Sequence, residues 1–264
     1  MPVANSARRF ALLPAVCAGL ILAGCAEPGS APAPRGAPAA DRAAPAASGA
    51  PATPASGPTG ARSPVARVAR IPGLGPAFQA RIPATTGQAF VVTGEARNSS
   101  IATAVLYERD PVTGWRAVKG PWPAHNALRG WTPDHRAGDL RTPIGVYRLG
   151  DAGGRLPDPG TRLPYDQSEE FNMPGTGFLG EPLEGSFDHV LAIDYNRVPG
   201  TTPLNKTRPQ GTAKGGGVWI HVDHGGPTRA CVALSEERLR ELLVALDPAK
   251  KPVIVMGDVG ALAR

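Results

Sequence analysis

Residues 219–234 read WIHVDHGGPTRACVAL, which places two histidines, His221 and His224, shortly before a lone cysteine, Cys231. The apolar run that ends at His221 is typical of a strand, and the Gly-Gly-Pro sequence that follows is typical of a turn. A ten-residue excursion through this turn can return the chain and bring Cys231 back beside His221. We therefore expect the thiol and the imidazole to lie next to each other.

The N-terminal residues have the pattern of an export signal. Arg8 and Arg9 form a positively charged start, and the apolar run 10–23 is too short to remain as a membrane-spanning helix. It leads into Leu-Ala-Gly-Cys, ending at Cys25, which resembles the lipobox of a bacterial lipoprotein signal peptide. On that resemblance, residues 1–24 are a signal peptide that is removed, and Cys25 is lipidated. A lipid anchor would hold the protein on the extracytoplasmic face of the membrane, in the cell envelope. The alternative is an ordinary secretory signal with a chance cysteine.

The composition separates a tether from a domain. Residues 26 to about 65 consist almost wholly of Ala, Pro, Gly, Ser and Thr, which cannot bury a core. We expect residues 25–65 to comprise the lipidated cysteine and a disordered tether that spans roughly 35 Å as a flexible coil. Residues 66–260 then remain for one catalytic domain. The formal net charge of +6 is scattered, without a run of Lys or Arg, so it does not indicate a nucleic-acid partner.

This domain is expected to be mainly β, because short apolar runs alternate with turn signals along it. One helix is expected after Ser235, a good N-cap, and a turn or short helix is expected over 166–171. The leucines that form the apolar face of the first helix are Leu239, Leu242, Leu243 and Leu246. The predicted strands cover 89–92, 101–107, 115–118, 144–149, 190–195, 217–222 and 253–256.

Cys231 is the cysteine that the mature chain would keep as a free thiol, since Cys17 lies in the predicted signal and Cys25 is predicted to be acylated. One interpretation is a buried, inert cysteine. The other is a nucleophile, which needs a nearby base because a thiol with a pKa of about 8.5 is only a few per cent ionised at neutral pH. His221 is the expected base, and His224 is either a second candidate or a solvated surface residue. Backbone amides at the N-terminus of the following helix are expected to hold an oxyanion. Two histidines and one cysteine, with no further ligand cluster, do not predict a metal site.

The chain resembles the catalytic domain of L,D-transpeptidases, the YkuD (or ErfK/YbiS/YcfS/YnhG) family, in two blocks. Residues 216–257 resemble the family's strand ending in His, its Gly-containing loop, its Ser/Thr-x-Gly-Cys segment, a short helix and a final strand. Residues 138–147, GDLRTPIGVY, resemble its Gly-Asp-x-x-Thr-Pro-x-Gly-x-Phe/Tyr segment, and Tyr195-Asn196 lies where relatives often have Tyr-Asn. The matching positions in the first block are His221, Gly226, Thr228, Cys231, Val232 and Leu234. The resemblance implies a mainly β, β-sandwich-type catalytic domain with one packed helix after the cysteine.

The resemblance also implies a reaction on peptidoglycan stem peptides. Cys231 would attack the carbonyl between the third residue of a stem tetrapeptide and its terminal D-Ala, while His221, oriented by a backbone carbonyl, takes the thiol proton. D-Ala would leave a thioester, which an amine of a neighbouring stem resolves as a 3→3 cross-link. The backbone amides of Cys231 and Ala230 would form the oxyanion hole, and no cofactor is implied. The residues expected to contact the substrate are Thr228, Arg229 and Tyr195.

Two departures from the family pattern leave alternatives open. Arg229-Ala230 stands where many relatives have His-Gly, and Ala233 stands where a polar residue is usual. Alanine at position 230 is harmless if its φ is negative and strained if its φ is positive. Arg229 either binds a substrate carboxylate or is simply exposed. The alternatives to a transpeptidase are an L,D-carboxypeptidase of the same fold, in which water resolves the thioester, and a catalytically degenerate envelope-binding lipoprotein.

Overall fold

The computed structural model describes residues 69–264, so the predicted signal peptide, Cys25 and the tether over 25–65 lie outside the described residues. The strands are β1 (Gln88–Gly94), β2 (Ile101–Asp110), β3 (Gly114–His125), β4 (Trp131–Thr132), β5 (Thr142–Pro143), β6 (Gly145–Gly154), β7 (Tyr165–Gln167), β8 (Val190–Ile193), β9 (Trp219–Val222), β10 (Val232–Leu234) and β11 (Val253–Asp258). The helices are α1 (Pro76–Arg81), α2 (Glu236–Ala245) and α3 (Val259–Leu262), and short 3₁₀ turns cover Thr212–Lys214 and Pro248–Lys250.

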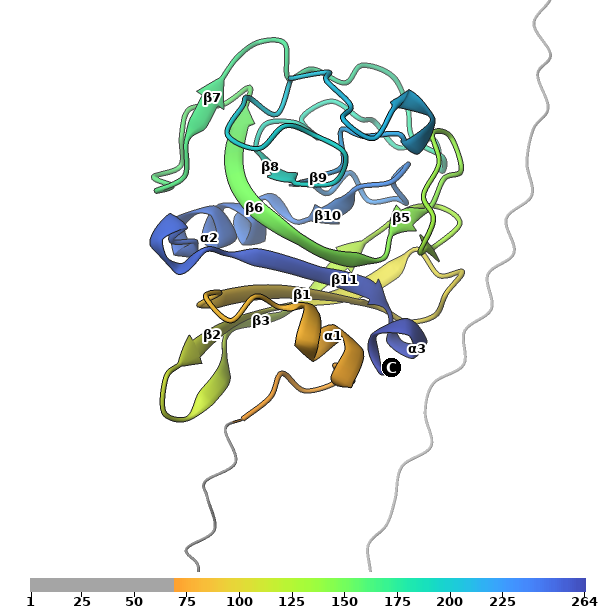
Figure 1. Ribbon diagram of the computed structural model, residues 1–264. Helices are drawn as coiled ribbons and strands as arrows, with labels where there is room; N and C mark the ends of the chain where they lie inside the picture. The colour runs from red at the N-terminus through yellow and green to blue at the C-terminus, as the bar shows by residue number, and fades with distance from the viewer. Residues whose placement is uncertain (1–68) are drawn as a thin grey trace, which may run out of the picture. The chain divides into compact units, whose positions relative to one another are not determined.

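Nine of these strands form one mixed sheet that closes on itself. Their order is β11-β1-β2-β3-β10-β9-β8-β6-β7, and β11 also pairs with β6, which completes a circuit of eight strands. Figure 1 shows β6 and β11 crossing the middle of the molecule, with α1 and α3 beneath β1 and β11. The prediction of a mainly β domain with a packed helix is confirmed. The two layers expected of a sandwich are joined here by continuous strand pairing.

The sequence of β1 explains why this strand is central. Its residues QAFVVTG are apolar on both faces and almost wholly buried, as expected for a strand covered on both sides. Phe90 and Val92 point into the main core inside the circuit. Ala89 and Val91 point the other way, into a second cluster that α1 and α3 cover. The alternation of side chains along the strand therefore serves two cores at once.

Helix α2 forms where the sequence predicts it. The Ser235 hydroxyl accepts a hydrogen bond from the backbone N–H of Arg238, as an N-cap does. Leu239, Leu242 and Leu243 are completely buried against the main core. This packing fixes the position of the chain directly after β10. Cys231 directly precedes β10, so the helix also helps to fix the strand next to the cysteine.

Three local features were only partly predicted or were not predicted. Residues 166–171, expected as a turn or short helix, contain a turn that follows the end of β7. The short helices α1 and α3 were not predicted, because each has too few residues to show a helical period. Strand β10, only three residues long, separates Cys231 from α2.

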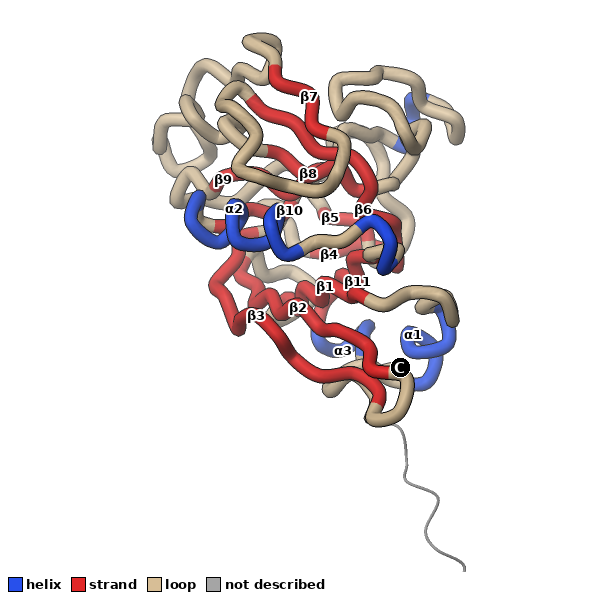
Figure 2. The backbone as a smooth tube through the Cα atoms, turned by 90° about the vertical axis from the view of Figure 1, so that its left-hand side faces the viewer, coloured by secondary structure: helices blue, strands red, loops and turns tan. Residues whose placement is uncertain are grey.

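Long connections gather around β7, β8 and β9, where Figure 2 shows mostly loop. The segments 168–189 and 194–218 join these short strands. Within residues 69–264, no helix is both long enough and apolar enough to cross a membrane. The loops that surround the candidate site are thus connected to the strands β7, β8 and β9.

Candidate active site

The pairing of β9 with β10 brings the cysteine back beside the histidine strand. The two strands are parallel, with Val232 level with Ile220, so Cys231 is level with Trp219 on the neighbouring strand. His221 is two residues further along and therefore on the same face of the sheet as Trp219. Strand geometry then places the Cα atoms of Cys231 and His221 about 8 Å apart, within reach of their side chains. The predicted juxtaposition is thus present in the fold.

The thiol of Cys231 is held by two backbone groups. The N–H of Trp219 donates to its sulfur at 3.4 Å, and the S–H group donates to the carbonyl of Gly217 at 3.7 Å. Burial raises the pKa of this thiol to about 11, and the Trp219 amide offsets only part of that rise. Cys231 is therefore a neutral thiol at rest, and it must turn from Gly217 toward His221 before it can be deprotonated.

The imidazole of His221 is held in one orientation. Its Nδ1 donates to the carbonyl oxygen of Val222 at 2.8 Å, which fixes the proton on Nδ1 and leaves Nε2 as the basic nitrogen. The ring is buried, and burial lowers its pKa to about 4, although the Val222 carbonyl partly opposes this effect. His221 is therefore neutral at pH 7 and able to accept a proton.

Both residues open into one pocket of about 470 Å³. Within residues 69–264, the backbone N–H groups of Ala230 and Cys231 have no protein acceptor, which leaves them free to donate to a ligand. Positive φ angles outside glycine occur only at Leu140, Asn196 and Lys251 in this part of the chain, so Ala230 is not strained. Free amides beside a nucleophile are the arrangement that stabilises an oxyanion.

A family model for the L,D-transpeptidase catalytic domain, YkuD, matches residues 91–255. The chain belongs to this family. Among solved structures, the helical cell shape determining protein Pgp2 from Campylobacter jejuni matches with 20% identity over 65% of this chain and 48% of that chain, with a TM-score of 0.33. The chain therefore spans about half the length of that protein. No curated protein matches the chain.

In this L,D-transpeptidase domain, Thr228 and Arg229 lie at the pocket as predicted, but they differ in what they offer a ligand. The hydroxyl of Thr228 is buried and donates to the carbonyl of Cys231 at 2.7 Å, so it fixes the backbone of the nucleophile. Arg229 is exposed, with its guanidinium 5.7 Å from the centre of the Phe178 ring. Arg229 can therefore reach an incoming anion, whereas Thr228 is occupied within the protein.

Tyr195 does not lie where a substrate contact was predicted. Its ring is buried and is not part of the lining of the pocket that contains Cys231. Its hydroxyl donates to the carbonyls of His135 and Lys214, at 3.2 and 2.9 Å. Tyr195 therefore ties two loops together, and the prediction that it binds substrate is corrected.

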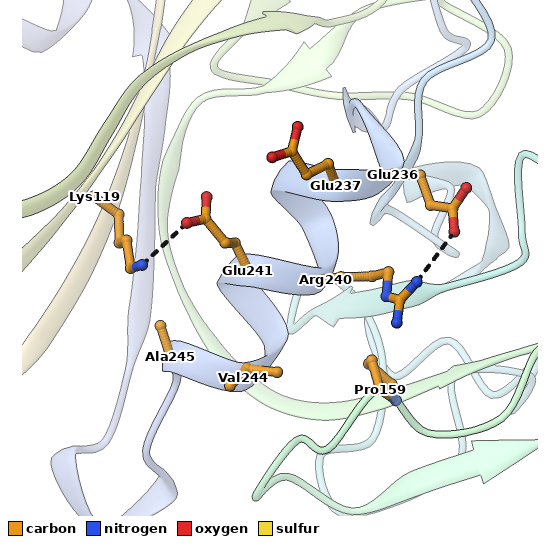
Figure 3. Close-up of a pocket in the computed structure, with 8 residues that line it drawn as sticks. All are labelled: Lys119, Pro159, Glu236, Glu237, Arg240, Glu241, Val244 and Ala245. Atoms are coloured by element: carbon orange, nitrogen blue, oxygen red, sulfur yellow. Dashed lines mark hydrogen bonds and ion pairs between the residues drawn. The ribbon is translucent and has the colours of Figure 1, made fainter.

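The N-terminus of α2 does not supply the oxyanion amides, because β10 lies between it and Cys231. Its first residues, Glu236 and Glu237, line a different and larger groove of about 650 Å³. Figure 3 shows that groove, where Glu241 pairs with Lys119 and Arg240 pairs with Glu236. The groove contains charged pairs but no thiol or imidazole, so the chemistry belongs to the smaller pocket.

His224 is not the solvated surface residue that the sequence suggested. Its side chain is 5% exposed, its ring stacks on His221 with a centroid distance of 5.8 Å, and its Nδ1 lies 3.1 Å from Oε1 of Glu181. Glu181 lies 43 residues earlier, in the connection between β7 and β8, and no local sequence pattern marks it. Among residues 69–264, no group of three or more His, Cys, Asp or Glu side chains is arranged to hold a metal ion.

Proposed function

We propose that this protein catalyses cysteine-dependent acyl transfer on peptidoglycan stem peptides, as an L,D-transpeptidase. The family to which the chain belongs acts on peptidoglycan. The observation that carries the proposal is the pocket that Cys231 and His221 share, which is also lined by Ala230; the backbone amides of Ala230 and Cys231 have no acceptor within residues 69–264. A nucleophile, a base and oxyanion donors are the parts that acyl transfer requires.

The chemical steps follow from the two neutral groups. The thiol of Cys231 turns toward His221, whose Nε2 takes its proton as the sulfur attacks the peptide carbonyl of the donor stem. The carbonyl oxygen becomes negatively charged and accepts hydrogen bonds from the backbone N–H groups of Ala230 and Cys231. His221 then gives the proton to the leaving amine, D-Ala departs, and a thioester remains on Cys231. An amine of an acceptor stem attacks the thioester, forms the 3→3 cross-link and returns the proton through His221 to the thiol.

A β-lactam of the carbapenem type tests the first half of this sequence, because its ring carbonyl acylates the same nucleophile. We expect intact-mass spectrometry of the folded protein to show one adduct, located on Cys231, and Cys231→Ala to show none. The absence of an adduct on the wild-type protein would contradict the proposal and favour a degenerate envelope-binding lipoprotein. Incubation with tetrapeptide stems distinguishes the two reactions, since water as acceptor gives the tripeptide of an L,D-carboxypeptidase and an amine gives a cross-linked dimer.

Arg229 is the residue at the pocket that we propose binds a carboxylate of the donor stem. Changing Arg229→Gln is expected to raise KM for the stem about 10- to 100-fold with little change in kcat, because a charge-assisted hydrogen bond contributes about 1.5–3 kcal/mol to binding. With the wild type, amidation of the stem's terminal carboxylate should raise KM by the same factor. With Arg229→Gln, the amidated stem should have the same KM as the unmodified stem. Arg136→Gln, which removes an exposed arginine of the Asp134 ion pair, is the matched control and should leave KM unchanged. An equal KM for both stems with the wild type would contradict this role.

We also propose that Cys25 anchors the protein to the extracytoplasmic face of the membrane through lipid. The lipobox-like sequence before Cys25 and the Pro- and Ala-rich residues after it support this placement. Incorporation of labelled palmitate by the wild type, and its loss in Cys25→Ser, is the test.

A further inference from the structure

His224 and Glu181 form a largely buried pair that the proposed acyl transfer does not use. The side chains of His224 and Glu181 are 5% and 12% exposed, and Nδ1 of His224 lies 3.1 Å from Oε1 of Glu181. His224 belongs to the loop after the catalytic strand β9. Glu181 belongs to residues 173–187, here called the pocket segment, several of which line the pocket together with residues of that loop. The pair therefore joins two segments that line the pocket.

The carboxylate of Glu181 is held tightly in place. Its Oε2 accepts the backbone N–H of Leu179 at 2.7 Å. A Cβ atom on Gly177 or on Gly226 would lie only 2.0 or 2.1 Å from Oε1, so both backbones approach the carboxylate closely because both residues are glycine. Gly177 comes from the pocket segment and Gly226 from the catalytic loop, so the carboxylate is enclosed by both.

The pocket segment itself is shaped around this carboxylate. Thr176 and Pro182 form an isolated antiparallel bridge, and the N–H of Gly177 donates to the carbonyl of Glu181 at 2.7 Å. The segment is thus a narrow hairpin with Glu181 at its neck. At its tip, Phe178 lies under the guanidinium of Arg229, which forms a second contact between the segment and the catalytic loop.

The pair also reaches the base through ring stacking. The rings of His221 and His224 are nearly parallel, with an interplanar angle of 11° and a centroid distance of 5.8 Å. Phe187, from the end of the pocket segment, meets the His221 ring edge to face at 5.4 Å. The Val222 carbonyl fixes Nδ1 of His221, and these two rings restrict the remaining rotation of the imidazole. His221 is therefore positioned partly by residues far from it in sequence.

We propose that Glu181 and His224 are positioning residues for His221, which restrict the orientation of its ring in the pocket by fixing His224 in the stack. The hydrogen bond to Glu181 stops the His224 ring from turning, and the stacked ring then keeps the His221 ring in the orientation set by the Val222 carbonyl. The carboxylate acts through His224 and touches neither the thiol nor the peptide. This inference rests on the proposed acyl transfer for its kinetic consequence, but the geometry of the ring can be measured without any activity.

The test is Glu181→Gln, which keeps the size of the side chain but offers one acceptor oxygen where the carboxylate uses two. Either His224 or the backbone N–H of Leu179 then faces the NH₂ group of the glutamine and loses its hydrogen-bond acceptor. We expect acylation of Cys231 by the β-lactam to slow by about 10- to 100-fold with unchanged initial binding, as is usual when a catalytic group is slightly misplaced. Glu184→Gln is the matched control, because it makes the same change at an exposed carboxylate of the same segment.

Nitrogen-15 NMR of the imidazoles provides a readout that does not depend on activity. In the wild type, His221 should give one sharp tautomer with a slowly exchanging Nδ1 proton, and in Glu181→Gln this signal should broaden and its proton should exchange faster. Unchanged His221 signals, or acylation at the wild-type rate, overturn the inference. If Glu181→Gln does not fold, His224→Phe replaces it, since it keeps a ring in the stack but loses the hydrogen bond, and the same slower acylation and broader signal are expected. If even the wild type is not acylated, the proposed function fails, whereas the NMR comparison still decides the role of the pair.

Discussion

His221→Ala is expected to slow the acylation of Cys231 at pH 7 by about 10²- to 10⁴-fold. The reason is the high pKa of the Cys231 thiol, which burial raises to about 11. At pH 7 only about one molecule in 10⁴ would carry a thiolate without help, as the distance between pH and pKa dictates. The base must therefore take the proton during the attack, because no thiolate is present beforehand.

The pH dependence distinguishes this mechanism from a preformed thiolate–imidazolium pair. Burial lowers the pKa of His221 to about 4, so the base is neutral and competent at every pH above that value. The wild-type rate should fall as the pH drops through about 4 and stay nearly constant from about pH 5 to pH 10. In His221→Ala the rate should instead rise about tenfold per pH unit until the thiol ionises near pH 11.

Both pH profiles are measured by mass spectrometry of the β-lactam adduct in samples quenched at set times across this pH range. The matched control is His125→Ala, a partly exposed histidine that pairs with Asp223 at 3.0 Å and does not line the pocket. It should change the rate by no more than about threefold, as surface substitutions usually do. A near-wild-type rate for His221→Ala at pH 7 would assign the base to another residue, and His224, whose ring stacks on that of His221, is then the candidate.

The parts of the fold that could be predicted from the sequence are those with a local cause. Strand β1 has a continuous apolar run, and α2 has an N-cap serine followed by leucines at helical spacing. The approach of Cys231 to His221 also has a local cause, since the short connection over 223–231 joins two neighbouring parallel strands. In each case the residues that determine the structure are close together in the chain.

The remaining features depend on packing between distant segments. Glu181 reaches His224 across 43 residues, and only the folded loops bring the two together. Tyr195 ends a predicted strand and matched a family position, but the sequence could not reveal that its hydroxyl donates to two backbone carbonyls. Strand β10 has three residues, too few for a period, so the sequence did not reveal that a strand lies between Cys231 and the predicted helix.

Arg197→Met is expected to lower the free energy of unfolding by about 3–5 kcal/mol, the usual cost of removing one partner from a buried ion pair. Nη1 of Arg197 donates to Asp151 at 2.7 Å and to Asp194 at 2.6 Å, and Nη2 donates to the carbonyl of Thr201 at 2.6 Å. The side chains of Arg197, Asp151 and Asp194 are 3%, 5% and 6% exposed. Without the guanidinium, two carboxylates remain buried with no cation between them.

The matched control is Arg162→Met, which breaks the pair of Arg162 with Asp247 at 2.9 Å. The Arg162 side chain is 57% exposed, so the same substitution should change stability by no more than about 1 kcal/mol. Urea unfolding of the wild type and both variants at pH 7 measures the difference. Equal losses of unfolding free energy in the two variants would contradict the expectation, because a buried ion pair would then stabilise the fold no more than an exposed one.

The pH dependence of the Arg197→Met defect identifies its cause. Burial raises the pKa of Asp194 in the folded protein, against the opposing pull of Arg197. A carboxyl whose folded pKa lies above its unfolded value binds its proton first in the folded state, so its protonation favours folding as the pH falls. Loss of Arg197 raises that folded pKa further, and the stability gap between Arg197→Met and the wild type should therefore narrow from pH 7 toward pH 5. The double variant Arg197→Met/Asp194→Asn removes the most unfavourable charge and should recover part of the loss at pH 7. A gap that is independent of pH, with no recovery in the double variant, would instead attribute the loss to packing of the arginine side chain.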